Sequence, residues 1–263
     1  MIVAGLQLDI AWEDPPENFA RVEHLALPAV QAGAHLLVLP EMFATGFSMA
    51  SERVSNHAQE IQNFLAGLSR LHGVWVLGGY AKPGKPRPHN VCALFDPQGN
   101  QALLYHKIHP FSLANEPKYY AAGNVLATHV VGDVRVTPLI CYDLRFPEVF
   151  RVTADNTDLY LVIASWPAAR IEAWQLLLRA RAVENQAFVL GVNRVGDGDG
   201  LHYSGNSALI DPMGQEKSAA LEQPTMILGE VNPEAVATCR RRFSFLADKK
   251  FKLYTTFYKG PKE

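Results

Sequence analysis

The sequence is poor in cysteine. Its 263 residues include only three, Cys92, Cys141 and Cys239. Three cysteines cannot form the disulfide framework that replaces a large core in small secreted proteins. The fold must therefore rest on a hydrophobic core, and each cysteine can be considered for its own chemistry.

The patterns of membrane proteins and nucleic-acid-binding proteins are also missing. The chain has no run of about 18 apolar residues that would span a bilayer, and residues 1–8 lack the basic start and cleavage site of a signal peptide. A formal net charge of −2 does not supply the basic face that releases counterions from phosphates. The densest basic cluster, Arg240–Arg242, is expected to be a solvated turn. We expect a cytoplasmic protein with no membrane or nucleic-acid partner.

Metal-ligand patterns are missing as well. His106 and His109 lie close in sequence, but no cysteine or carboxylate accompanies them at the spacing of a zinc site. Residues 196–200 read GDGDG but lack the further acidic residues that a calcium loop has at fixed positions. We interpret this segment as a flexible turn between strands and expect no bound metal.

What the chain does have is the balance of a soluble globular protein, with 48% hydrophobic and 19% charged residues. Because no polar linker rich in proline and glycine divides it, one domain over residues 1–263 is expected. Apolar runs of strand length alternate with stretches of helical periodicity, which indicates an α/β fold with two sheets covered by helices. The predicted strands are Ile2–Asp9, His35–Leu39, Val74–Tyr80, Val91–Asp96, Ala102–His106, Val134–Ile140, Leu159–Ala164, Ala187–Val192, Ser204–Ile210 and Met226–Val231; the predicted helices are Glu17–Ala32, Asn56–His72, Pro147–Ala154 and Ala168–Asn185, and a mostly polar tail follows.

Two charged residues stand directly after predicted strands. Glu41 follows the apolar run Leu36–Pro40, at a carboxyl end of the kind where ligands bind in open α/β sheets. It suits a general base whose pKa is tuned by partial burial. Lys107 follows the strand Ala102–His106, where an ammonium can stabilise a developing oxyanion. A solvated carboxylate and an exposed lysine are the alternatives.

Cys141 is the most informative residue. It closes the apolar strand Val134–Ile140, and Pro147 is well placed to begin a helix because its missing N–H costs nothing there. Cys141 would then occupy a strand-turn-helix elbow, from which a nucleophile projects while the backbone N–H of Tyr142 faces the substrate oxygen. A nearby helix N-terminus also favours thiolate over thiol. The alternative is a buried structural cysteine.

Three segments resemble the signature segments of the nitrilase superfamily, in the family's order: LPEMF around Glu41, HKIHPF around Lys107 and ICYDLRFPE around Cys141. The likeness covers nearly the whole chain, and three separated motifs seldom match together by chance. The resemblance implies a four-layer αββα sandwich and a catalytic triad of these three residues. It also implies a homodimer, with its contact near the predicted helices Pro147–Ala154 and Ala168–Asn185.

Further positions match the same family. Glu116, in NEPKYYAAGN, matches a second glutamate that holds the catalytic lysine and positions substrate; a solvated loop carboxylate is the alternative. Residues 165–167 match a segment that lines the substrate pocket, although Trp166 would otherwise be a core residue. The segment RARAVENQ, Arg179–Gln186, resembles a helix end where structural ion pairs are expected.

Within the superfamily the likeness is strongest to the omega-amidase branch, which hydrolyses the terminal amide of 2-oxo dicarboxylic acid monoamides such as 2-oxoglutaramate. The resemblance implies a thioester on the cysteine, with the glutamate acting as base and acid, and no metal or organic cofactor. The alternatives are a carbamoylase or nitrile hydrolase with the same triad, and a non-catalytic regulator that keeps the fold.

An omega-amidase must bind a carboxylate at the far end of its substrate, which requires a positive group or several hydrogen-bond donors in the pocket. Arg145 lies shortly before Pro147 and can equally pair with Glu148. The basic candidates close to pocket segments are Arg145, Lys118 and Arg170, and the candidate pocket walls are Tyr119, Tyr120 and Trp166.

Overall fold

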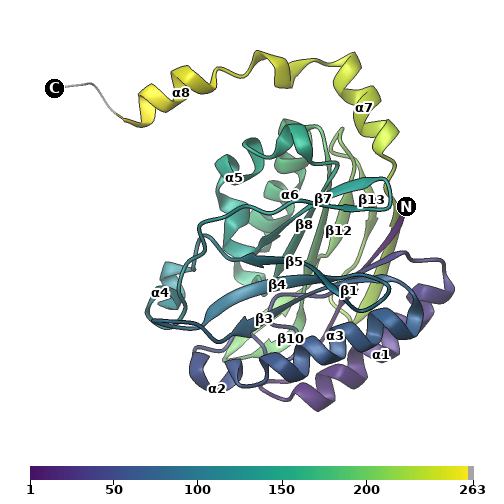
Figure 1. Cartoon of the computed structure of the whole chain (residues 1–263), viewed down its shortest axis with the longest axis vertical. Coiled ribbons are helices and arrows are strands. Elements are labelled where there is room, and N and C mark those ends of the chain that lie inside the picture. Colours follow the sequence, from purple (N-terminus) through teal and green to yellow (C-terminus); the bar gives the residue numbers. More distant parts are fainter. Residues whose placement is uncertain (260–263) are drawn as a thin grey trace.

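The computed structural model describes residues 1–259, so the last four residues of the predicted domain lie outside the described part. Two six-stranded sheets pack face to face (Figure 1). In spatial order the first sheet contains β14 (Thr225–Glu230), β1 (Ile2–Gln7), β2 (Leu36–Val38), β3 (Trp75–Lys82), β4 (His89–Phe95) and β5 (Gln101–His106). The second contains β13 (Glu216–Ala219), β12 (Ala208–Ile210), β9 (Phe188–Asn193), β8 (Leu159–Ala164), β7 (Val134–Ile140) and β6 (His129–Val131). A separate hairpin pairs β10 (Val195–Gly198) with β11 (Leu201–Ser204).

Helices cover the outer face of each sheet (Figure 1). The first sheet is covered by α1 (Pro15–Gln31) and α3 (Ala58–His72), and the second by α5 (Pro147–Arg151) and α6 (Ile171–Asn185). The predicted four-layer αββα sandwich is therefore confirmed. Four further α-helices in the described range are α2 (Ser51–Ser55), α4 (Glu116–Tyr119), α7 (Pro233–Arg242) and α8 (Phe251–Tyr258).

The central strands are apolar throughout because both of their faces are buried. In β2, Leu36 and Val38 belong to the core between the two sheets, whereas Leu37 belongs to the core beneath α1 and α3. This alternation follows from the two-residue period of a strand. Strands covered on both sides read as continuous apolar runs, which is why they are conspicuous in the sequence.

Two predicted segments differ from the structure after residue 200. The predicted strand Ser204–Ile210 is interrupted, because Gly205 and Asn206 have φ angles of 69° and 57° and turn the chain between β11 and β12. The polar tail contains two helices, α7 and α8. Of their residues only Val236 and Cys239 of α7 are buried, so the two helices contribute little to the main core.

The cluster Arg240–Arg242 is the last turn of α7, in which Arg241 and Arg242 are exposed as expected and Arg240 is not. The guanidinium of Arg240 is half-buried and donates to the carbonyl oxygens of Thr157 at 2.8 Å, Gln186 at 3.1 Å and Asn185 at 3.2 Å. Two of these carbonyls belong to the end of α6, where backbone acceptors have no partner within the helix. Arg240 therefore attaches α7 to the end of α6.

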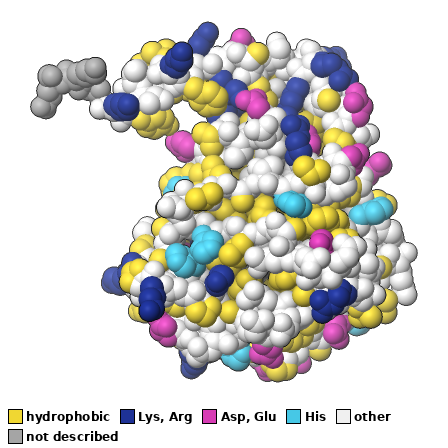
Figure 2. Space-filling view, in the orientation of Figure 1, with side chains coloured by type: hydrophobic (Ala, Val, Ile, Leu, Met, Phe, Trp, Pro, Cys, Tyr) yellow, Lys and Arg dark blue, Asp and Glu magenta, His cyan; other side chains and the backbone are white. Residues whose placement is uncertain are grey.

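Beyond α7 the chain runs away from the body of the protein, and α8 extends over α5 as an arm (yellow in Figure 1). Every residue of α8 is exposed, and Figure 2 shows a hollow between this arm and the body. The arm is attached by the hydroxyl of Tyr258, which donates to Glu148 Oε1 at 3.0 Å, and by an ion pair of Lys249 with Asp155 at 2.6 Å. Within residues 1–259, no helix is both long enough and apolar enough to cross a membrane.

Candidate active site

Glu41, Lys107 and Cys141 lie where strands of the two sheets end. Glu41 follows β2, Lys107 directly follows β5, and Cys141 directly follows β7. The strands β2 and β5 point the same way, because β2 is parallel to β3 and two antiparallel pairings lead from β3 to β5. Their carboxyl ends therefore meet at one edge of the sheet, which is where ligands bind in α/β folds.

The carboxylate of Glu41 is fully buried and accepts three hydrogen bonds. Its Oε1 accepts from Nζ of Lys107 at 2.8 Å and from Nδ2 of Asn90 at 2.7 Å. Its Oε2 accepts from the backbone N–H of Ser165 at 2.9 Å. Because Ser165 follows β8 of the second sheet, this bond joins the two sheets at the site, and together the three donors fix the orientation of the carboxylate.

The ammonium of Lys107 is buried between two carboxylates. It lies 2.8 Å from Glu41 and 2.9 Å from Oε2 of Glu116. Burial by itself lowers the pKa of Lys107, but the charges of Glu116 and Glu41 outweigh it and raise that pKa above its ordinary value. Burial raises the pKa of Glu116, and the Lys107 ammonium only partly opposes this. The two carboxylates therefore favour the protonated form of Lys107, and the expected contact with Glu116 is present.

Asn90, which belongs to none of the motifs, connects the two carboxylates. Its Nδ2 donates to Oε1 of Glu41 at 2.7 Å and to Oε1 of Glu116 at 2.9 Å. It lies in β4, one residue before the predicted strand Val91–Asp96, and its backbone carbonyl accepts from Lys107 N at 2.9 Å. A polar residue beside an apolar run was the only signal in the sequence.

Cys141 occupies the predicted elbow between β7 and α5, which begins at Pro147. Its φ of +47° is uncommon for a residue other than glycine. Met42, which follows Glu41, and Asn115, which precedes Glu116, have φ angles of 46° and 56°. Such conformations persist where the surrounding structure holds them, and they cluster at functional sites.

The buried carboxylate of Asp143 holds the elbow in place. Its Oδ2 accepts from the backbone N–H of Ile140 at 3.0 Å and from the hydroxyl of Tyr105 at 2.8 Å. Its Oδ1 accepts from the backbone N–H of His109 at 3.0 Å and lies 2.8 Å from the ring Nδ1 of the same residue. These contacts restrain the backbone on both sides of Cys141.

A second support for the elbow comes from α6. The guanidinium of Arg181 donates twice to the carbonyl oxygen of Leu144, at 3.0 and 2.7 Å, and pairs with Glu184 at 2.9 Å. The ion pair expected in the segment Arg179–Gln186 is therefore present, and it belongs to a residue that restrains the turn after Cys141.

The thiol of Cys141 is not predisposed to ionise. Burial raises its pKa and the negative charge of Glu41 raises it further, while Lys107 and the N–H of Ser165 lower it only in part. Burial and Glu41 therefore outweigh any stabilisation of the thiolate by the nearby helix N-terminus. The helix α5 has only five residues, so its dipole is weak compared with burial and a neighbouring carboxylate. Ionisation of this thiol requires a base.

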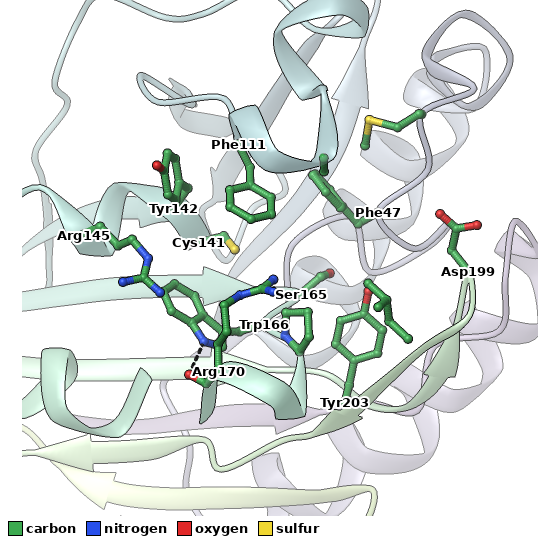
Figure 3. A pocket seen from close by; sticks show the side chains of 14 residues that line it. Phe47, Phe111, Cys141, Tyr142, Arg145, Ser165, Trp166, Arg170, Asp199 and Tyr203 are labelled. Carbon is green, nitrogen blue, oxygen red and sulfur yellow. Dashed lines mark hydrogen bonds between the residues drawn. The ribbon is translucent and has the colours of Figure 1, made fainter. Parts of the chain in front are cut away.

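A pocket with a volume of about 180 Å³ opens beside Cys141 (Figure 3). It is smaller than the roughly 300–1,000 Å³ typical of drug-sized ligand pockets, so it suits a small substrate. Tyr142, Arg145 and Trp166 line it, as predicted, and so does Arg170. Further residues that were not predicted to line the pocket also do so, among them Phe47, Phe111, Asp199, Leu201 and Tyr203.

Two of the three basic candidates face this pocket. The guanidinium of Arg145 lies 4.9 Å from the Trp166 ring, and that of Arg170 lies 5.3 Å from the Phe111 ring. Neither forms an ion pair with a carboxylate of residues 1–259, and Glu148 instead accepts from Tyr258. Lys118, Tyr119 and Tyr120 do not line the pocket. The first two are exposed, and the hydroxyl of Tyr120 donates to a backbone carbonyl in the protein interior.

The segment GDGDG contributes more than the turn that was expected. Asp199 and Gly200, with φ angles of 50° and 72°, form the tight turn between β10 and β11. This hairpin carries Asp199, Leu201 and Tyr203 to the pocket. No group of histidine, cysteine or acidic residues suited to hold a metal ion occurs in the described part of the chain.

Residues 2–241 match the family model of the carbon-nitrogen hydrolases. The chain belongs to the carbon-nitrogen hydrolase family. It is 37% identical to omega-amidase YafV of Escherichia coli (strain K12), covering 90% of this chain and 92% of the relative. It is 30% identical to 2-oxoglutaramate amidase of Bacillus subtilis, covering 96% and 98%. The predicted family is thus confirmed, and with it the assignment as an amidohydrolase.

Solved structures agree with the family assignment. A CN-hydrolase superfamily protein from Xanthomonas campestris, which carries an arsenic adduct in its active site, has a TM-score of 0.89 at 34% identity, covering 95% of this chain and 97% of that one. An amidase from Nesterenkonia sp. has a TM-score of 0.88 at 24% identity, with coverage of 97% and 95%, and supports the fold.

The raised pKa of Cys141 leads to a prediction about thiol reactivity. Alkylation by iodoacetamide consumes the thiolate, so the rate at Cys141, followed by mass spectrometry, is expected to keep rising above the pH of an ordinary thiol pKa, about 8.5. Glu41→Gln removes a nearby negative charge and is expected to shift the profile to lower pH. Glu148→Gln removes an exposed carboxylate and serves as the control. A wild-type profile that levels off below pH 8 contradicts the prediction.

Proposed function

We propose that the chain is a single carbon-nitrogen hydrolase domain that hydrolyses the terminal carboxamide of a small carboxylic acid, of the 2-oxoglutaramate or 2-oxosuccinamate type, to the acid and ammonia. The observation that carries this proposal is the pocket itself. It places the guanidinium groups of Arg145 and Arg170, neither paired with a carboxylate of residues 1–259, in the same small space as the thiol of Cys141. The names of the Escherichia coli and Bacillus subtilis relatives support the same substrate class.

The first half of the proposed reaction forms a thioester. Glu41 takes the thiol proton of Cys141, and the thiolate attacks the amide carbon while the carbonyl electron pair moves to oxygen. The Lys107 ammonium and the backbone N–H of Tyr142 stabilise this oxyanion. Glu41 then returns the proton to nitrogen, the C–N bond breaks, and ammonia leaves.

The second half hydrolyses the thioester. Glu41 takes a proton from a water molecule, and the hydroxide attacks the thioester carbon. The C–S bond then breaks to release the acid, and Glu41 returns its proton to the sulfur to restore the thiol. The raised pKa of Lys107 supports this division of roles, because a lysine held in its protonated form does not act as the base. Glu116 keeps the ammonium in place and balances its charge. No step needs a metal or organic cofactor.

The nucleophile assignment predicts that Cys141→Ala abolishes turnover of 2-oxoglutaramate. Cys141→Ser is expected to be nearly inactive too, because a hydroxyl has a much higher pKa than a thiol and a carboxylate is too weak a base for it. Ammonia release is the measurement. The matched controls are Cys92→Ala and Cys239→Ala, which remove buried cysteines outside the pocket. Equal loss of turnover in a folded control would reject Cys141 as the specific nucleophile.

A substrate carboxylate has a physical reason to bind beside Arg145. The guanidinium of Arg145 lies over the indole of Trp166. The Nε1–H of that indole donates to the backbone carbonyl oxygen of Arg170 at 2.8 Å. This arrangement connects both arginines to one rigid aromatic side chain. A guanidinium without a protein carboxylate partner can form a charge-assisted bidentate pair with a substrate.

The carboxylate site predicts the substrate preference. We expect 2-oxoglutaramate and succinamate to have a kcat/KM at least about tenfold above that of butyramide, or about 1.4 kcal/mol, which one charge-assisted contact supplies. Arg145→Met should mainly raise KM for the charged substrates and leave butyramide unaffected. Lys118→Met removes an exposed charge outside the pocket and is the control. Equal use of butyramide, a matched nitrile or an N-carbamoyl amino acid would reject the omega-amidase assignment and leave the triad untouched.

We also propose that the enzyme is a homodimer formed through α5 and α6. Apolar side chains exposed on this side support the proposal, namely Val152 after α5 and Leu176 and Val183 of α6. We expect a dimer in sedimentation at micromolar concentration. Leu176→Glu should shift it toward the monomer because it places a charge in an apolar contact, whereas Leu71→Glu on α3 should not. A monomeric wild-type chain would refute the proposal.

A further inference from the structure

Arg194 is a buried charge that the proposed reaction does not use. It follows β9, and none of its surface is exposed. An oxygen of Asp9 lies 4.0 Å from its Nη2, but that carboxylate is itself 45% exposed. Burial lowers the pKa of Arg194, and the negative charges of Asp9 and Asp197 only partly oppose this. A buried cation with such weak pairing costs stability.

The hydrogen bonds of Arg194 join the β10–β11 hairpin to the body of the protein. Its Nε donates to the carbonyl oxygen of Val195 at 3.2 Å, and its Nη2 donates to that of Asp197 at 2.9 Å. The same Nη2 donates to the carbonyl oxygen of Ile10, in the segment after β1, at 3.0 Å. The guanidinium therefore holds β10 against a segment that is distant in sequence. Its Nη1 has no hydrogen-bond partner within residues 1–259.

The same guanidinium contacts a wall of the pocket. Its central carbon lies 4.5 Å from the centroid of the Tyr203 ring, a cation–π geometry that is strengthened by burial. Tyr203 lies in β11 opposite Gly196 of β10 and lines the pocket together with Leu201 (Figure 3). Arg194 thus holds both strands of the hairpin, one through the backbone and the other through an aromatic ring.

Gly198 leaves space for the guanidinium of Arg194, and Gly46 lies next to it. A Cβ on Gly198, in β10, would lie 2.7 Å from Nη1, which is too close, whereas a Cβ on Gly46 would lie 3.6 Å from the same atom, an ordinary contact distance. Gly46 precedes Phe47, which lines the pocket. The guanidinium therefore fills the space between two segments that carry pocket residues, the hairpin and the segment that ends at Phe47.

We propose that Arg194 is a positioning residue that holds the β10–β11 hairpin, and Tyr203 in particular, as a wall of the substrate pocket. It sets substrate affinity and takes no part in bond making or breaking. No hydrogen bond within the described residues joins its side chain to Glu41, Lys107 or Cys141. The proposal rests on the proposed amidase function, because affinity is read from the KM of the amide substrate.

The test separates KM from kcat. We expect Arg194→Met to raise KM for 2-oxoglutaramate at least about tenfold and to change kcat less than about threefold, as when binding common to ground and transition states is lost. Arg194→Lys keeps the positive charge but lacks the planar guanidinium with its several donors, so its KM should lie between those of the wild type and Arg194→Met. Amide hydrogen exchange of residues 195–204 should be faster in Arg194→Met. The control is His202→Ala, which removes an exposed hairpin residue that pairs with Asp197.

If Arg194→Met does not fold, Gly198→Ala displaces the guanidinium without removing it, and the same rise in KM is expected. The proposal is overturned if folded variants keep the wild-type KM, or if kcat falls while KM stays constant. A wild-type protein that hydrolyses no amide rejects the proposed function instead. Hydrogen exchange then decides by itself, since unchanged exchange of residues 195–204 in folded Arg194→Met overturns the positioning role.

Discussion

The rest of the site depends on the ion pairs that the buried ammonium of Lys107 forms with two carboxylates. A charge removed from water is tolerated when it is paired and hydrogen-bonded, and Lys107 has the carboxylates of Glu41 and Glu116 as partners. Asn90 donates to both carboxylates and keeps them together. Three parts of the chain are thereby fixed to one another: the segments after β2 and β5, and the start of α4.

The second sheet joins this arrangement through one backbone N–H. Ser165 N donates to the free oxygen of Glu41, so a residue after β8 completes the environment of a carboxylate from the other sheet. The close approach of β3 to the backbone of Glu41 requires a glycine at position 79, because a Cβ on Gly79 would lie 2.9 Å from Glu41 Cα. Cys141 has a left-handed backbone conformation, and the carboxylate of Asp143 restrains it by accepting from the backbone N–H of Ile140. The strands determine where these groups lie, and the buried polar contacts determine how they are oriented.

In the proposed function, chemistry and substrate recognition are carried by different parts of the fold. The charged groups and the thiol stand at strand ends, which are held by the hydrogen bonds of the sheets. The pocket around them is made largely by connecting segments, including those that carry Phe47 and Phe111 and the hairpin that carries Tyr203. Loops tolerate changes that strands do not, so a fold of this kind can change its substrate while keeping its reaction.

The sequence alone determined the α/β architecture, the strands β7 and β8 at their observed bounds, and three candidate residues at strand ends, because apolar runs and their limits are local properties. The family resemblance added the arrangement of layers. Only the tertiary structure decided that Asn90 contacts Glu41, 49 residues away, and that Ser165 does so from 124 residues away. It also decided that Arg145 and not Lys118 faces the pocket. Such contacts depend on how separate strands and turns pack against one another, and no local pattern records that.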